Sequence, residues 1–573
     1  MLDKLFPKKG SVKEQKVALS IEGMTCVHCA TGIEKRLSQT KGVKQTQVSY
    51  PDGKGIFVYD PEIVSAEEIT NAINGIDNYR VTGEVGGDTV EKSGVDTALL
   101  GNGIPQYDLI IVGGGSAAFS AAIKANDLGL STLMVNGGLP MGGTCVNLGC
   151  VPSKNLIRAA ETVYHANHSN FPGIWPLGAE VNFAQVIRDK NALVVSLQQK
   201  KYLDVVSDFT NLTMLEGWAE FVDEKTIRIN GKQEYKGLKF LIATGATTNI
   251  PDIEGLEEVG YLTNESLFNL EKQPESLTIM GAGYIGLEIA MAYNRLGTKV
   301  RIIEFTDRVL RSQTPDISEA IESYMREEGI EILPNFRAIK FEKKGHETII
   351  HSKCPDGSVT QLNEPGKVVI ATGIRANSRR MGLENIGLET DERGHIQVNE
   401  NMETSHPYIF AAGDVANTPS FVYTAAYEGK IAVENAFTSA DRKTDYDALP
   451  WVVFTDPQIA GAGMDEQQTE AAGIPYEVSK LPLSEVPRSI AANDTRGFIK
   501  LIRNTETDKL LGARVVAPEG GELIQQVSMA IKYGISVQEL AEGLYPYLTL
   551  SEGIKLAAIT FGKDITKLSC CAS

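Results

Sequence analysis

Two glycine-rich turns, each lying between a short apolar run and a helical stretch, constrain the fold more than any other feature of this sequence. The first has the sequence GGGSAA and follows residues 108–112, and the second has the sequence GAGYIG and follows residues 277–280. Both fit the pattern G-x-G-x-x-G/A, in which glycines permit a tight turn and let a pyrophosphate approach a helix N-terminus. The sequence therefore predicts an α/β protein with two Rossmann-like dinucleotide-binding domains. The residues expected to cradle the dinucleotides are Gly113, Gly115, Ala118, Gly281, Gly283 and Gly286.

Further apolar runs complete the two domains and indicate how they are connected. Residues 240–245 (FLIATG) close the first domain, and residues 368–373 (VVIATG) close the second. Residues 409–414 (IFAAGD) then return to the first domain and end at Asp414. One dinucleotide-binding domain inserted in another is the layout of a flavoprotein that accepts hydride from a nicotinamide.

The residue that ends the second strand of each domain bears on the ribose of the bound dinucleotide. Asn136 occupies this position in the first domain, where an acid is usual, and its amide can still form a hydrogen bond. Glu304 occupies it in the second domain, and an acid there favours the free 2′-hydroxyl of NADH over the 2′-phosphate of NADPH. Arg308 and Arg311 follow closely and could accept a phosphate instead.

Cys145 and Cys150 lie between glycines, just after the first glycine-rich turn, at the expected start of a helix. A helix N-terminus helps to lower the pKa of a thiol, and the thiolate is both a nucleophile and a ligand for soft metals. A buried structural disulfide is the main alternative, but disulfides in a reducing compartment tend to be catalytic. A zinc site is disfavoured because no further cysteine or histidine pair lies nearby to complete four ligands.

The N-terminal segment carries a second close pair, Cys26 and Cys29, in the sequence GMTCVHC. Alternating apolar residues and a capping-box sequence at Ser65 predict the order β-α-β-β-α-β, which is ferredoxin-like. This segment resembles the heavy-metal-associated domain, whose two thiolates bind a soft ion. Two thiolates suit Hg(II) or Cu(I), whereas zinc would require more ligands. A thioredoxin-type redox pair is the alternative.

The remaining cysteines and the net charge limit the partners. Cys570 and Cys571 form a third pair near the C-terminus, and Cys354 stands alone and is interpreted as structural. The net charge of −18 argues against a nucleic-acid partner or an anionic membrane surface. No apolar run is long enough to cross a bilayer and no targeting segment follows Met1, so we expect a cytoplasmic protein without membrane insertion.

These observations divide the chain into seven parts. They are a tail (1–14), a heavy-metal-associated domain (15–83), a flexible linker (84–105), a FAD-binding domain (106–250 and 373–445), an inserted NADP-binding domain (251–372), an α+β dimerisation domain (446–562) and a C-terminal dithiol tail (563–573). A tethered accessory domain would act at high effective concentration near the main body.

Residues 106–562 resemble the pyridine nucleotide-disulfide oxidoreductases, through both glycine-rich turns, both ATG turns and the motif GTCVNLGCVPSK. The resemblance implies a homodimer with FAD. Lys154 would lie beside the flavin and pair with Glu288, Cys150 would contact the flavin ring, and Cys145 would exchange with substrate. Tyr284 would gate the nicotinamide site. The FAD would also be lined by Gly138, Thr144, Ala243, Asp414 and the Phe421-Val422 stretch.

One departure from the disulfide reductases of this family bears on the substrate. Tyr547 stands where they carry a histidine that protonates the leaving thiol, and a tyrosine with a pKa of about 10 is a poor base at neutral pH. With the C-terminal thiols and the N-terminal domain, this resembles the members of the family that reduce Hg(II).

The resemblance implies a route for electrons and a route for the metal. NADPH would reduce FAD, and FAD would reduce Hg(II) to Hg(0). Cys26 and Cys29 would capture Hg(II), the partner subunit's Cys570 and Cys571 would take it up, and Cys145 and Cys150 would receive it beside Tyr284 and Tyr547. The alternatives are a flavin-dependent disulfide reductase and a soft-metal binding or trafficking protein.

Overall fold

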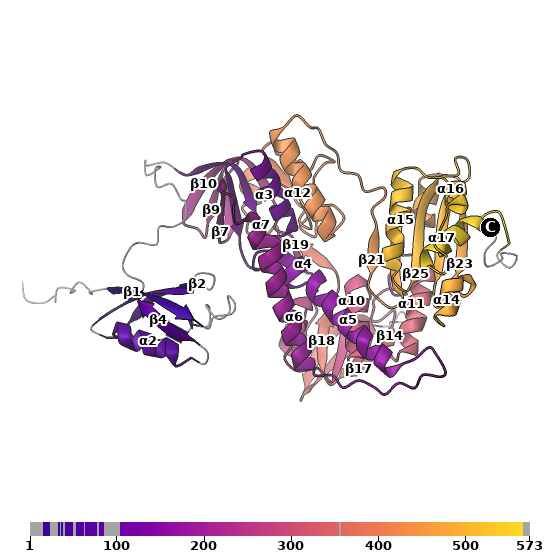
Figure 1. Ribbon diagram of the computed structural model, residues 1–573, viewed down its shortest axis with the longest axis horizontal. Helices are drawn as coiled ribbons and strands as arrows, with labels where there is room; N and C mark the ends of the chain where they lie inside the picture. The colour runs from indigo at the N-terminus through magenta and orange to yellow at the C-terminus, as the bar shows by residue number, and fades with distance from the viewer. Residues whose placement is uncertain are drawn as a thin grey trace, which may run out of the picture. The chain divides into compact units, whose positions relative to one another are not determined.

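The computed structural model in Figure 1 separates the chain into two compact units, Met1–Ala98 and Leu99–Ser573. It describes residues 15–22, 33–34, 36–37, 40–49, 53–61, 63–76, 79–84, 104–353 and 357–564. Cys26, Cys29, Cys354, Cys570 and Cys571 lie outside these residues, and so do their predicted roles. Within these ranges, no helix combines the length and apolar character needed to span a membrane.

The first unit contains a four-stranded antiparallel sheet with the strand order β2-β3-β1-β4. Alternate residues of β1 are buried, as the pattern of Val17, Leu19 and Ile21 predicts. The capping box of Ser65 and Glu68 begins α2 as predicted. The last strand continues past Val81, because β4 pairs with β1 as far as Glu84. The elements are β1 (Gln15–Glu22), β2 (Val43–Ser49), β3 (Lys54–Tyr59), α2 (Ala66–Asn74) and β4 (Arg80–Glu84).

The first dinucleotide lobe of the second unit is built on the sheet β7-β6-β5-β10-β9-β8, to which β20 adds on β10. Its parallel strands β5, β6, β10 and β20 carry buried apolar runs, and α3 and α12 pack closely over them (Figure 1). A side chain on Gly429 of α12 would lie 2.2 Å from the carbonyl of Ala117. The elements are β5 (Gln106–Val112), α3 (Ser116–Asp127), β6 (Thr132–Asn136), β7 (Leu212–Glu216), β8 (Ala219–Asp223), β9 (Thr226–Ile229), β10 (Gln233–Ile242), β20 (Ile409–Ala411) and α12 (Val422–Phe437).

The second dinucleotide lobe is inserted between β10 and β20 and has the parallel strand order β14-β13-β12-β18. The chain leaves and re-enters the first lobe through the antiparallel pair β11 and β19. The elements are β11 (Ala246–Thr248), α9 (Asn264–Leu267), β12 (Ser276–Met280), α10 (Tyr284–Arg295), β13 (Lys299–Ile303), α11 (Pro315–Glu327), β14 (Glu331–Leu333), β15 (Arg337–Lys344), β16 (Glu347–Lys353), β17 (Val359–Glu364), β18 (Lys367–Ile370) and β19 (Ile374–Ala376).

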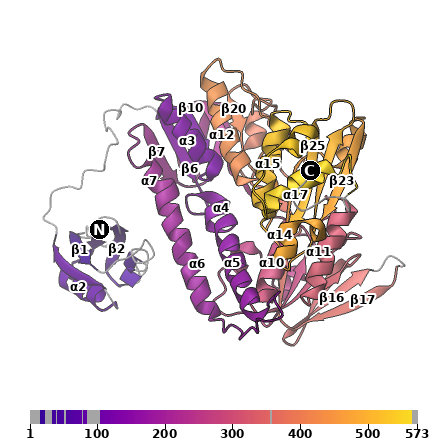
Figure 2. The same cartoon turned by 45° about the vertical axis from the view of Figure 1, so that its right-hand side comes forward.

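The C-terminal part is a five-stranded antiparallel sheet, β21-β22-β25-β24-β23, with helices packed on it (Figure 2). One apolar core joins this sheet to the second lobe and to the long helices α5 and α6. The elements are α5 (Cys150–Asn167), α6 (Phe183–Gln198), β21 (Trp451–Val453), β22 (Gln458–Gly463), β23 (Tyr476–Pro482), β24 (Phe498–Asn504), β25 (Leu510–Ala517), α15 (Gly520–Lys532), α16 (Val537–Glu542) and α17 (Leu550–Ile559).

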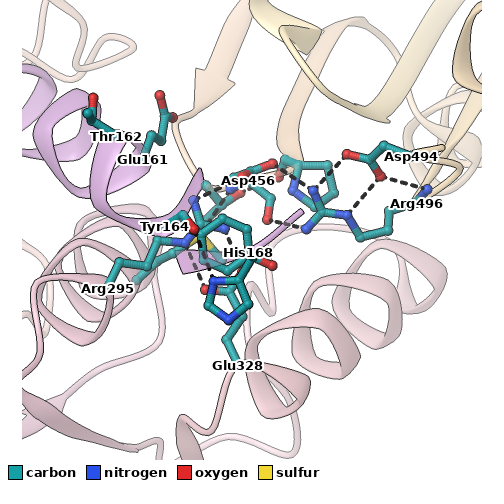
Figure 3. Close-up of polar contacts among 12 residues, drawn as sticks. Glu161, Thr162, Tyr164, His168, Arg295, Glu328, Asp456, Asp494 and Arg496 are labelled. Carbon is teal, nitrogen blue, oxygen red and sulfur yellow. Dashed lines mark hydrogen bonds and ion pairs between the residues drawn. The ribbon is translucent and has the colours of Figure 1, made fainter. Parts of the chain in front are cut away.

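A buried ion network also connects these parts (Figure 3). Arg295, at the end of α10, is 2% exposed along its side chain and pairs with Glu328 at 2.8 Å and with Asp456 at 2.9 Å. Its guanidinium lies 3.9 Å from the ring centre of Tyr164 on α5. Arg496 pairs with the other oxygen of Asp456 at 3.1 Å. The network therefore ties the second lobe to α5 and to the C-terminal sheet.

Candidate active site

The first glycine-rich turn is shaped by the close approach of two backbone segments. Gly113 has φ +132°, and a Cβ there would lie 2.1 Å from the carbonyl oxygen of Ala243. Gly115 is the N-cap of α3. Because glycine has no side chain, no side-chain hydrogen bond caps the first N–H groups of this helix. Unpaired N–H groups at a helix N-terminus bind phosphate, so this turn fits a dinucleotide pyrophosphate.

The segment with the two cysteines lies directly on this turn. The N–H of Gly142 donates to the carbonyl of Gly114 at 2.7 Å, and a Cβ on Gly143 would lie 2.6 Å from the Cα of Gly115. The prediction that both cysteines begin one helix is only partly right. Cys145 lies within the short helix α4 (Gly143–Asn147), and Cys150 is the first residue of α5.

The turn between the two cysteines is held from both lobes. The Nδ2 atom of Asn147 donates to the carbonyl of Gly143 at 2.9 Å. Asn264, on α9 of the second lobe, donates to the carbonyl of Leu148 at 3.0 Å and accepts a hydrogen bond from Thr248. The thiol pair is therefore placed by contacts from far along the chain as well as by its local sequence.

The two thiols are free and partly buried, and they are hydrogen-bonded to each other. The hydrogen bond from Cys145 lowers the pKa of Cys150 to about 7, against the opposing effect of burial, and the Lys154 ammonium adds to the lowering. The same hydrogen bond and burial raise the pKa of Cys145. From about pH 7 upward, Cys150 therefore ionises to the thiolate while Cys145 keeps its proton.

Lys154 and Glu288 form the ion pair that the family resemblance implies. Lys154 lies one turn after Cys150 on α5, and its Nζ is 2.8 Å from the carboxylate of Glu288 on α10. The other oxygen of Glu288 accepts a hydrogen bond from the N–H of Phe454 at 3.0 Å, and the Phe454 ring lies 4.5 Å from Nζ. Phe454 belongs to no motif, so the sequence alone did not predict its contacts with Lys154 and Glu288.

The second glycine-rich turn repeats the backbone geometry of the first. Gly281 has φ +109°, and a Cβ there would lie 2.4 Å from the carbonyl oxygen of Ala371. A Cβ on Gly286 would lie 2.1 Å from the carbonyl of Gly281. Gly283 is the N-cap of α10 without a side-chain hydrogen bond, so this turn also fits a pyrophosphate.

Glu304 contacts this second turn. It is the first residue after β13, one position beyond the strand that it was predicted to end. One carboxylate oxygen accepts from the N–H of Ala282 at 2.7 Å, and the other accepts from the N–H of Thr306 at 2.8 Å. Arg308 donates to the carbonyl of Gln313 at 3.2 Å, whereas Arg311 is mostly exposed and pairs with Asp307.

The other predicted residues line the first lobe or the C-terminal sheet. Asp414 follows β20, burial raises its pKa, and no hydrogen bond to its carboxylate occurs among the described residues. Val422 begins α12. Asn136 donates to the carbonyl of Leu139 at 2.8 Å. Tyr547 precedes α17 and is 52% exposed. Of the remaining positions, Ala118 is fully buried, Thr144 is exposed, and Gly138 has φ +90° and faces Trp218.

Comparison with protein families agrees with this geometry. Residues 107–429 match the model described as pyridine nucleotide-disulphide oxidoreductase, and residues 449–558 match its dimerisation domain. Residues 18–77 match the heavy-metal-associated domain. The chain therefore belongs to the pyridine nucleotide-disulphide oxidoreductase family.

Individual relatives place the chain in a narrower group within this family. The chain is 39% identical to a mercuric reductase from Lysinibacillus sphaericus, over 97% of this chain and 100% of the relative. It is 41% identical to a mercuric reductase from Streptomyces lividans, over 81% of this chain and 98% of the relative. At this identity and coverage, the chain is a member of the mercuric reductase family.

Solved structures show the same architecture. A structure described as the HOCl-induced flavoprotein disulfide reductase RclA from Escherichia coli matches with a TM-score of 0.70 and 29% identity, over 78% of this chain and 98% of that one. Its Cu(II) complex matches with a TM-score of 0.72 and 28% identity, over 80% of this chain and all of that one.

Proposed function

We propose that this chain is a mercury(II) reductase that takes electrons from NADPH through FAD and releases elemental mercury. The observation that carries the proposal is the pair of free thiols, Cys145 and Cys150, on the first glycine-rich turn, one helical turn from the Lys154–Glu288 ion pair. A pair of thiols suits a thiophilic ion, and the match to the mercuric reductase from Lysinibacillus sphaericus covers 97% of the chain.

The residues of the first lobe fit FAD. The N–H groups at the start of α3 would hold its pyrophosphate, and the buried carboxylate of Asp414 would find a hydrogen-bond donor there. Gly138, Thr144, Ala243 and Val422 would line the same site. When bound, FAD would supply a two-electron carrier between nicotinamide and substrate. The Lys154–Glu288 pair would fix a positive charge close to the thiols.

The second lobe would bind the nicotinamide donor at the start of α10, with Gly281, Gly283 and Gly286 giving room for the pyrophosphate. We propose NADPH as the donor, with the exposed Arg311 as the cation for its 2′-phosphate. NADH is the alternative donor, because the Glu304 carboxylate lies against the same turn.

The thiols would take Hg(II) by ligand exchange. Hg(II) would arrive with two thiolate ligands, and the Cys150 thiolate would displace one of them. Cys145 would then pass its proton to the departing thiolate and displace the second ligand, so that two Hg–S bonds form as two break and no bare ion is released. Reduction of the bound Hg(II) by two electrons gives Hg(0) and leaves the thiols unchanged.

Cys26 with Cys29 and Cys570 with Cys571 would deliver Hg(II) to this pair. The match of residues 18–77 to the heavy-metal-associated domain supports the first step. The dimerisation-domain match supports a homodimer, in which the C-terminal thiols and Tyr547 would come from the partner subunit.

A disulfide reductase is the second candidate, and the likeness to the disulfide reductase RclA favours it. Tyr547 argues against this activity because it cannot replace a histidine base at neutral pH. The deciding experiment follows NADPH oxidation with and without Hg(II), in excess small thiol, and collects mercury vapour. Hg-dependent oxidation matched by vapour supports the proposal, whereas turnover with disulfides alone contradicts it. Cys150→Ala serves as the inactive control.

A further inference from the structure

The side chain of Tyr284 is stacked on a residue of the C-terminal domain. Tyr284 is the first residue of α10, directly after the second glycine-rich turn, and Trp451 is the first residue of β21. Their ring centres are 5.6 Å apart and their planes are inclined by 22°. The residue predicted to gate the nicotinamide site is therefore held by a domain that carries no dinucleotide loop.

The indole of Trp451 packs against its own sheet. Trp451 pairs with Gly461 of β22, and a Cβ on Gly461 would lie 2.4 Å from the indole Cζ2 atom. Only glycine at this position leaves room for the ring. The guanidinium of Arg514 lies 5.6 Å from the indole centre, and it is fixed by hydrogen bonds to the carbonyls of Ala462 and Ala513. These contacts fix the indole independently of Tyr284.

The hydroxyl of Tyr284 is held separately, by its own lobe. Gln313 is buried and donates from Nε2 to the Tyr284 hydroxyl at 3.0 Å. The Oε1 atom of the same amide is buried and has no hydrogen-bond partner among the described residues. Tyr284 is thus held at its hydroxyl by the nicotinamide lobe and along its ring by the C-terminal domain.

We propose that Trp451 is the positioning residue that holds Tyr284 in its closed position, and that this stack loosens when a nicotinamide dinucleotide binds. The inference rests on the proposed function for nicotinamide binding at the start of α10, and on the family resemblance for Tyr284 as the gate of that site. Aromatic stacking favours the stacked state by about two- to twelvefold. Loss of the stack therefore lowers the free energy needed to reach the open state.

The first test measures nicotinamide binding to flavin-loaded full-length protein by calorimetry, with NADP⁺ and NAD⁺ as separate probes. Trp451→Ala is expected to lower the Kd by about two- to twelvefold. Gly461→Ala should act in the same direction because its methyl group displaces the indole. Trp451→Phe keeps a ring and should restore most of the difference. Trp175→Phe, at a tryptophan that is 81% exposed, is the matched control.

The second test uses a spectroscopic signal that a purely structural role would not move. The chain has three tryptophans, so a W175F/W218F protein reports on Trp451 alone. Adding NADP⁺ or NAD⁺ should change the Trp451 emission, and a further Tyr284→Ala change should abolish this response. An unchanged emission on nicotinamide binding, or an unchanged or raised Kd in Trp451→Ala, would overturn the proposal.

Neither test contains mercury, which separates this inference from the proposed function. If nicotinamide binding alters Trp451 but Hg(II) does not stimulate NADPH oxidation, the stack is supported and only the mercury activity fails. If Hg(II) is reduced and Trp451 does not respond, the reductase stands and the inference fails. Should Gly461→Ala not fold, Trp451→Phe and the emission measurement still decide between the two outcomes.

Discussion

The two glycine-rich turns share their backbone geometry but differ in what covers them. In each, a glycine with positive φ lies against the carbonyl of an alanine, Gly113 against Ala243 and Gly281 against Ala371. The first turn is covered by backbone, because Gly143 of the thiol segment lies on Gly115. On the second turn, a Cβ on Gly283, the counterpart of Gly115, would meet nothing within 4 Å, and the Glu304 carboxylate accepts from the N–H of Ala282.

This difference indicates that the first turn retains its dinucleotide and that the second turn exchanges it. Backbone packed on backbone cannot move aside without disrupting α4 and the hydrogen bond of Gly142. Side chains such as Tyr284 can change rotamer on a much faster timescale. We therefore expect the first lobe to keep its dinucleotide through many turnovers and the second to bind and release one in each turnover.

The largest expected effect comes from placing a methyl group in either turn. Gly113→Ala should give a protein without flavin, whereas Gly281→Ala should keep its flavin but fail to be reduced by NADPH. The backbone strain alone costs about 1–3 kcal/mol, which corresponds to a change of about fivefold to 150-fold in an equilibrium constant, and the clash adds to it. Flavin absorbance per chain and anaerobic reduction by NADPH measure the two effects.

Gly345→Ala is the control for this comparison. Gly345 has φ +67°, and a Cβ there would meet nothing within 4 Å, so the change adds backbone strain without a clash. Loss of flavin from Gly281→Ala would contradict the division of labour between the two turns.

The next effect concerns the far end of the helix that the second turn begins. Arg295→Met should lower the free energy of unfolding by about 3–5 kcal/mol, because Glu328 and Asp456 lose a buried partner. Lys443→Met removes an exposed pair with Glu400 and should leave the free energy of unfolding almost unchanged. Urea unfolding of the flavin-loaded proteins measures the loss of unfolding free energy in both variants. Equal losses would show that the buried network stabilises the fold no more than an exposed pair does.

A third prediction concerns the thiol segment that covers the first turn. Cys145→Ala removes the hydrogen bond that contributes most to the low pKa of Cys150, so this pKa should rise from about 7 toward the ordinary value of 9.0. Because the thiolate exists only above the pKa, alkylation of Cys150 at pH 7 should slow, and its midpoint should move to higher pH. Peptide mass spectrometry after iodoacetamide treatment across pH 5–10 gives the profile, and an unmoved midpoint would contradict the assignment.

The smallest effect concerns the nucleotide preference of the second turn. Arg311→Ala should lower kcat/KM for NADPH by about threefold to fivefold, as expected for one exposed ion pair, and leave NADH unaffected. Steady-state rates with the two donors measure this, and NADH is the internal control. A parallel loss with both donors would show that Arg311 does not contact the 2′-phosphate.

The sequence predicted the parts of the site that depend on local backbone geometry. Glycine positions and short apolar runs located both turns, since only glycine tolerates the close carbonyls beside Gly113 and Gly281. The Lys154–Glu288 pair followed from the family resemblance alone, because 134 positions separate the two residues.

Contacts made by packing between distant segments were not predictable. Neither Trp451 beside Tyr284 nor Phe454 beside Lys154 belongs to a motif, and both depend on how the C-terminal sheet docks on α10. Glu304 was recognised from its position, but its hydrogen bonds to the turn depend on the exact end of β13. The roles of the N-terminal and C-terminal cysteine pairs stay predictions.

The network around Arg295 has a consequence for recombination among relatives. A chimaera that takes its C-terminal domain from another protein without a carboxylate at position 456 would leave the Arg295 guanidinium buried beside one acid instead of two. The ring of Tyr164 on α5 lies 3.9 Å from the same guanidinium, so α5 belongs to the same set of contacts. Helices α5 and α10 and the C-terminal domain should therefore come from the same parent protein. Viable crossovers should fall outside these elements.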